Sequence, residues 1–140
     1  MLSNVFCAAT FGVEGYIVTI ECNVVNRLEK FDIVGLPDLP VREAKERIRS
    51  AIENSGFEFP EAEITVNMAP ADIKKQGTSY DLAILVGVLL AAGELRPHTD
   101  VKKSCFIGEL SLSGRIKPVK GALSMCLVAK DAGFDTVYVP

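Results

Sequence analysis

Apolar and polar residues alternate over residues 16–25, with the period of two that is typical of a half-buried strand. The residues on the apolar side are Val18, Ile20, Cys22 and Val24. The segment 4–11 also reads as a strand, and the residues between the two, at 12–15, suit a turn. The pattern predicts a β-hairpin over 4–11 and 16–25.

A helical pattern follows a short predicted strand at 31–34. Asp38 is a suitable N-cap, and Pro40 suits the first turn because its missing N–H needs no partner there. The apolar face comprises Val41, Ala44, Ile48, Ala51 and Ile52. The opposite face is charged, with Glu43 and Arg47 four residues apart, and Gly56 ends the predicted helix.

The second half of the chain begins with another alternating segment, which predicts a strand at 63–68. A polar loop at 70–77 follows, and Thr78 with Asp81 three residues later resembles a capping box. From Leu82 onward the helix is apolar all round, as expected of a helix in the middle of a domain. Further strands at 105–111, 115–119 and 136–139 and a helix at 121–132 complete the prediction. Together they predict an α+β domain with a mixed β-sheet and three main helices.

Composition and charge exclude several classes of protein. With 140 residues and 49% hydrophobic content, the chain suits one globular domain and excludes disorder. Its longest apolar stretch, 82–92, is shorter than the roughly 18 residues of a membrane span, and the N-terminus does not resemble a signal peptide. We therefore expect a cytoplasmic protein without membrane contact. The net charge of −3 excludes a global nucleic-acid footprint but leaves a local basic patch open.

The sequence shows no motif for a metal site or for a nucleotide cofactor. The four cysteines are far apart and His98 is the only histidine, so we expect reduced thiols and no metal site. The chain contains neither a Walker A loop nor a G-x-G-x-x-G motif, so we expect no cofactor and no nucleotide hydrolysis within these residues.

Ser79 is a candidate nucleophile, because a serine at the start of a buried helix lies where the helix dipole favours negative charge. It would need a desolvated lysine to take its proton, whereas the lysines at 74, 75, 117 and 120 lie in loop or turn contexts. The free N–H groups at 77–79 also suit an anion, but a helix N-terminus capped by Thr78 itself is the favoured interpretation. Five basic residues are candidate nucleic-acid or partner contacts, with solvated loop charges as the alternative: Lys74, Lys75, Arg115, Lys117 and Lys120.

Several longer strings carry a family resemblance over nearly the whole chain. They are FDIVGLPD at 31–38, VREAKERIRSAI at 41–52, NSGF at 54–57, ITVNMAPAD at 64–72, GTSYDL at 77–82 and FIGELSL at 106–112. This combination resembles the N-terminal domain of the ComM/YifB family of bacterial Mg-chelatase-like AAA+ ATPases. The resemblance implies the fold of the Lon proteolytic domain, a two-layer fold also found in a ribosomal protein. It implies that residues 1–140 are a single Lon-like (ChlI-type) domain of a longer protein whose ATPase domain is not in this chain.

The resemblance also implies partners and chemistry. An AAA+ module of the same polypeptide would bind ATP and Mg, the full-length protein would form a homo-oligomer, and DNA processing in competence would be its setting. Compared with Lon, Ser79 stands at the position of the nucleophile and Leu123 at that of its lysine partner. An aliphatic side chain cannot accept a proton, and Lys120 lies three residues earlier.

We therefore expect a non-catalytic accessory domain that engages subunits or nucleic acid. The alternatives are a Ser79-dependent, peptidase-like hydrolase with a relocated lysine, and a stand-alone nucleic-acid-binding module.

Overall fold

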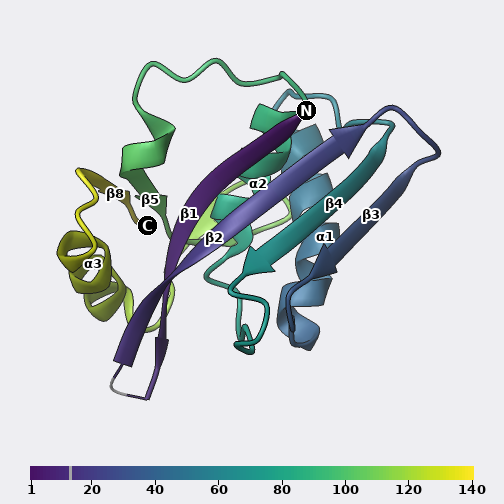
Figure 1. Ribbon diagram of the computed structural model, residues 1–140. Coiled ribbons are helices and arrows are strands. Elements are labelled where there is room, and N and C mark those ends of the chain that lie inside the picture. Colours follow the sequence, from purple (N-terminus) through teal and green to yellow (C-terminus); the bar gives the residue numbers. More distant parts are fainter. Residues whose placement is uncertain (13) are drawn as a thin grey trace.

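A six-stranded mixed sheet with the strand order β3-β4-β2-β1-β5-β8 is the frame of the structure (Figure 1). The computed structural model describes residues 1–12 and 14–140. The hairpin of β1 (Leu2–Phe11) and β2 (Glu14–Val25) lies at the centre of the sheet. The other strands add on both sides of it: β4 (Glu63–Ala69) and β3 (Lys30–Val34) beyond β2, and β5 (Ser104–Phe106) and β8 (Thr136–Tyr138) beyond β1.

The central hairpin confirms the prediction from the alternating pattern. Its antiparallel register pairs Val5 with Ile20, and both side chains are fully buried. The predicted turn over 12–15 is too long, because Thr10 pairs with Gly15 and Phe11 with Glu14, so the ladder continues to the tip. Residue 13 of that predicted turn lies outside the described residues.

Helices α1 (Leu39–Asn54) and α2 (Asp81–Ala91) cover one face of the sheet and lie behind it in Figure 1. Helix α1 begins as predicted, with the Asp38 carboxylate accepting a hydrogen bond of 3.0 Å from the Val41 amide. Its five predicted apolar residues are the buried ones. Helix α2 is buried almost all round, as its sequence predicts, and packs against β1, β2 and α1.

The segment predicted as one strand at 105–111 is divided into two. The Gly108 amide donates to the Ser79 carbonyl, and the Gly108 carbonyl accepts from the Leu82 amide, so this backbone is bonded to the start of α2. The chain therefore leaves the sheet after β5 and forms a small hairpin of β6 (Glu109–Leu110) and β7 (Ile116–Lys117). The predicted return strand at 115–119 is correspondingly shorter. A short 3-10 helix, η1 (Val101–Lys103), precedes β5.

Helix α3 (Ala122–Asp131) packs against β1 and β2 and lies away from α1 (Figure 1). It occupies the face of the sheet opposite to α1 and α2. Phe6 alternates along β1 with the core residues Val5 and Cys7 and therefore points to this opposite face. There its ring packs on that of Phe134, just after α3, with 5.3 Å between the ring centroids. The predicted α+β class with a mixed sheet and three main helices is confirmed. No helix in the described part of the chain is long and apolar enough to cross a membrane.

Candidate ligand-binding cleft at the start of helix α2

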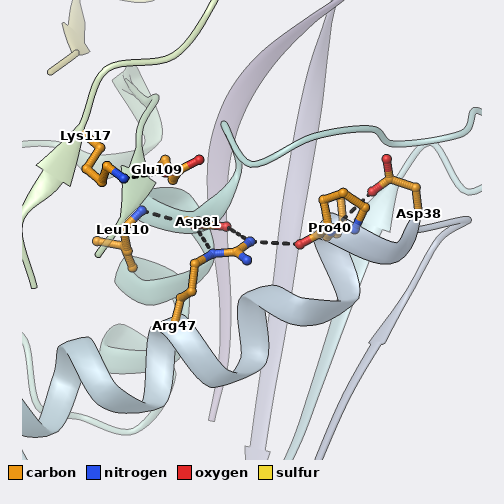
Figure 2. Close-up of polar contacts among 8 residues, drawn as sticks. Asp38, Pro40, Arg47, Asp81, Glu109, Leu110 and Lys117 are labelled. Atoms are coloured by element: carbon orange, nitrogen blue, oxygen red, sulfur yellow. Dashed lines mark hydrogen bonds and ion pairs between the residues drawn. The ribbon is translucent and has the colours of Figure 1, made fainter. Parts of the chain in front are cut away.

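A buried ion pair fixes the start of α2 against α1 and the β6–β7 hairpin (Figure 2). The Asp81 carboxylate is 1% exposed and accepts hydrogen bonds from Arg47 Nε at 2.7 Å, Arg47 Nη2 at 3.0 Å and the Leu110 amide at 3.1 Å. Arg47 Nη2 also donates to the Pro40 carbonyl at 2.8 Å. One carboxylate thus joins three elements that are distant in the sequence.

This pair overturns two predictions about the same residues. Arg47 does not pair with Glu43 on the charged outer face of α1 but turns toward α2, where it finds a desolvated carboxylate. Asp81 does not complete a capping box with Thr78, because its side chain is committed to Arg47 and Leu110; Tyr80 precedes the helix and makes no side-chain cap. Burial raises the pKa of Asp81, while the hydrogen bonds from Arg47 and Leu110 act in the opposite direction. Its hydrogen bond to Asp81 raises the pKa of Arg47.

A second buried charge holds the loop 70–77 against the turn that precedes α1. Lys75, predicted to be a solvated loop residue, is fully buried, so that prediction is wrong. Its ammonium group donates to the Gly35 carbonyl at 2.8 Å and to the Pro70 carbonyl. The backbone supports the same link, since the Lys75 amide donates to the Leu36 carbonyl and the Asp38 amide to the Lys75 carbonyl. Burial lowers the pKa of Lys75.

Asp38 connects this loop to the start of α2 as well. Its second carboxylate oxygen accepts a hydrogen bond of 3.1 Å from the Gly77 amide, while the first caps α1. Gly77 has a φ of +89°, a conformation that glycine adopts without strain. The backbone of 77–80 is thereby held in place from both sides, by Asp38 before it and by Asp81 after it.

A cleft of about 490 Å³ lies in front of this backbone. Its walls come from four parts of the chain: the end of β1, the segment before α2, the β6–β7 hairpin with the residues after it, and α3. The lining residues with side chains able to form hydrogen bonds are Thr10, Gln76, Thr78, Ser79, Tyr80, Glu109 and Lys120.

Ser79 lies in this cleft with only 7% of its surface exposed. Among the described residues its hydroxyl has no hydrogen-bond partner, and no fully enclosed side-chain nitrogen or oxygen lacks one. The hydroxyl oxygen therefore reaches the open space of the cleft. Lys120 lines the same cleft with an exposed side chain. Leu123, at the position where the resemblance to Lon places the lysine, is 75% exposed on α3 and does not line the cleft.

The five basic residues singled out in the sequence are not brought together as one patch. Lys75 is buried, and Lys117 pairs across β6–β7 with Glu109 at 3.4 Å. A hydrogen bond with the Thr78 side chain and the nearby Lys117 lower the pKa of Glu109. Lys74 and Arg115 are exposed on separate loops, which leaves Lys120 as the basic side chain in the cleft.

Sequence reasoning missed the part of the site that depends on topology. Thr10 and Met125 line the cleft because β1 and α3 end beside the start of α2, and neither residue carries a local signal. Asp81 did carry one, since an acidic residue that opens an all-apolar helix needs a buried partner.

The remaining candidate chemistry concerns metals and thiols. Within 1–12 and 14–140, no group of three or more histidine, cysteine or acidic side chains is placed to hold a metal ion. Cys7, Cys22 and Cys105 are buried free thiols, and burial raises the pKa of both Cys22 and Cys105 to about 12. Cys126 is free and half-buried.

Comparison with known proteins places these features in a family. The family model described as subunit ChlI of Mg-chelatase matches residues 20–140. The chain is 45% identical over 136 residues to the YifB protein of Salmonella typhimurium, which covers 97% of the chain and 27% of that relative. It is 40% identical over 129 residues to the competence protein ComM of Haemophilus influenzae, covering 92% of the chain and 25% of ComM.

A more distant similarity reaches Lon protease 1 of Myxococcus xanthus, with 28% identity over 133 residues, 90% of the chain and 16% of that protease. The chain spans about a quarter of the length of the ComM and YifB relatives that it matches. It therefore belongs to the ChlI family of Mg-chelatase-like proteins, as a domain homologous to the N-terminal region of YifB and ComM.

Proposed function

We propose that this chain is a non-catalytic accessory domain of a Mg-chelatase-like AAA+ ATPase. In this proposal the longer protein carries an AAA+ module that binds ATP and Mg, assembles as a homo-oligomer and acts on DNA. The domain contacts neighbouring subunits or nucleic acid. The family membership and the quarter-length coverage of ComM and YifB support this proposal.

The observation that carries the non-catalytic role is the chemistry around Ser79. A serine hydroxyl becomes a nucleophile only with a group that accepts its proton. Leu123 has no such group and lies outside the cleft. Lys120 lies in the cleft but is exposed, whereas a lysine that serves as a base is withdrawn from water.

The test is a turnover assay on the purified chain. We expect no hydrolysis of ATP with Mg and none of a denatured protein or a fluorogenic peptide. In the full-length protein, deletion of residues 1–140 should leave basal ATP hydrolysis in place and change oligomer assembly or the response to DNA. Turnover by the purified chain that is lost in Ser79→Ala would overturn the proposal.

A second candidate function is a Ser79-dependent hydrolase with Lys120 as the relocated lysine. It is favoured by one observation, namely that both residues line the same cleft. A fluorophosphonate probe distinguishes the two proposals, because it labels activated serines. Labelling that is lost in Ser79→Ala and in Lys120→Gln, but kept in the control Ser124→Ala on α3, would support the hydrolase. An unlabelled wild-type chain would exclude it.

A further inference from the structure

The backbone at the start of α2 has hydrogen-bond donors that the fold does not use. The Asp81 amide donates to the Thr78 carbonyl and the Leu82 amide to the Gly108 carbonyl. No hydrogen bond within the described chain uses the amides of Thr78, Ser79 or Tyr80. These residues line the cleft and directly precede an eleven-residue helix, where unpaired N–H groups and the helix dipole favour an anion.

The Ser79 hydroxyl is an independent indication of a ligand. The Ser79 residue is 7% exposed, its hydroxyl has no partner among the described residues, and the hydroxyl oxygen is accessible from the cleft. Because the hydroxyl oxygen is open to the cleft and has no partner within the described chain, a ligand in the cleft can take the hydrogen bond that water would otherwise make. The hydroxyl and the free amides thus lie on one wall.

The charges at the cleft favour an anionic ligand. Lys120, which follows the β6–β7 hairpin, supplies a positive charge to the lining of the cleft. Glu109 is the acidic residue in the lining, and its carboxylate is already paired with Lys117 at 3.4 Å. The negative charge of Asp81 lies behind the helix start, paired with Arg47. The donors at the start of α2 are therefore the Ser79 hydroxyl and several amides, and Lys120 adds a cation to the same cleft.

We propose that this cleft binds a phosphate group through the Ser79 hydroxyl, the amides of residues 78–80 and the Lys120 ammonium. A phosphate has enough acceptor oxygens for all of these donors at once. The cleft of about 490 Å³ also leaves room for the nucleoside to which a phosphate is attached. The site goes beyond the proposed accessory role, since a domain without phosphate binding would still contact subunits.

The test is titration of the purified chain, followed by the backbone amide resonances of residues 78–80. The probes are inorganic phosphate, adenosine monophosphate and a short single-stranded oligonucleotide, each against sodium chloride of equal ionic strength. We expect saturable shifts of these amides with at least one probe. Binding of inorganic phosphate alone would indicate a site for free phosphate. Binding of adenosine monophosphate would indicate a nucleotide site, and tighter binding of the oligonucleotide than of the other probes would indicate a site for a polynucleotide backbone.

Matched variants make the result specific. Lys120→Gln should weaken binding about tenfold, since it removes a charge-assisted contact from an exposed residue that the fold does not need. Lys130→Gln, on an exposed part of α3 outside the cleft, should bind like the wild type. Ser79→Ala should weaken binding with the chain still folded. The proposal is overturned if no probe shifts these amides saturably, or if Lys120→Gln binds as tightly as Lys130→Gln.

Discussion

The buried pair of Arg47 and Asp81 gives the sharpest test of how this fold is stabilised. Arg47→Met keeps an unbranched side chain of similar reach but removes three hydrogen bonds, two to Asp81 and one to the Pro40 carbonyl. It leaves the Asp81 carboxylate, 1% exposed, with the Leu110 amide as its remaining partner. The variant thus creates an uncompensated buried charge.

The expected cost follows from the exposure of the two side chains. Removal of one partner from a buried pair destabilises by about 3–5 kcal/mol. The Arg47 side chain is 20% exposed, so water reaches the vacated place and we expect a loss near the lower end, about 3 kcal/mol. The double variant Arg47→Met/Asp81→Leu removes both charges and should be more stable than Arg47→Met alone.

Urea unfolding followed by far-ultraviolet circular dichroism measures these losses, with unchanged m-values as evidence that the unfolded states are comparable. The control is Arg42→Met on the same helix, because Arg42 is exposed and its side chain makes one hydrogen bond, to the Pro37 carbonyl. Its cost should stay below about 1 kcal/mol. An Arg47→Met variant no less stable than Arg42→Met would refute the reasoning.

Three further substitutions test the turn before α1 and the loop bound to it. Gly35→Ala should cost more than about 2 kcal/mol in urea unfolding, because φ is +107° and a Cβ would lie 2.4 Å from the Met68 carbonyl oxygen. Asp38→Ala should lower the melting temperature through a loss of about 1–2 kcal/mol, since it uncaps α1 and frees the Gly77 amide. Burial lowers the pKa of Lys75, so the folded state binds its proton less tightly and wild-type stability should rise, relative to Lys75→Met, as pH increases toward the ordinary lysine pKa. Parallel stability curves of wild type and Lys75→Met from pH 7 to 10 would contradict this last prediction.

The fold was predictable wherever hydrophobic periodicity decides the structure. The alternation at 16–25, the apolar face of α1 and the uniformly apolar α2 depend on which side chains leave water, and each is confirmed. The segment 105–111 reads as a continuous strand but divides at Gly108. The backbone there bonds to the Ser79 carbonyl and the Leu82 amide, partners more than 20 residues away that no local pattern reveals.

The candidate site was predictable only in part, for an electrostatic reason. Ser79 was singled out because its place at a helix start is a local property. The burial of Lys75 was missed because loop lysines are solvated unless backbone carbonyls surround them, and here those carbonyls belong to Gly35 and Pro70. Arg47 was assigned to a neighbour on its own helix, although the stronger partner, Asp81, lies on the next one.

The central position of the first hairpin has a consequence for how the chain is made. Residues 2–25 are synthesised before the segments that pair with them, so their two strands have unpaired edges until 63–69 arrives on one side and 104–106 on the other. Both partners are distant in sequence, so these contacts close large loops and form well after the hairpin has been synthesised. The nascent hairpin is therefore the stage at which edge-to-edge association with other chains competes with folding.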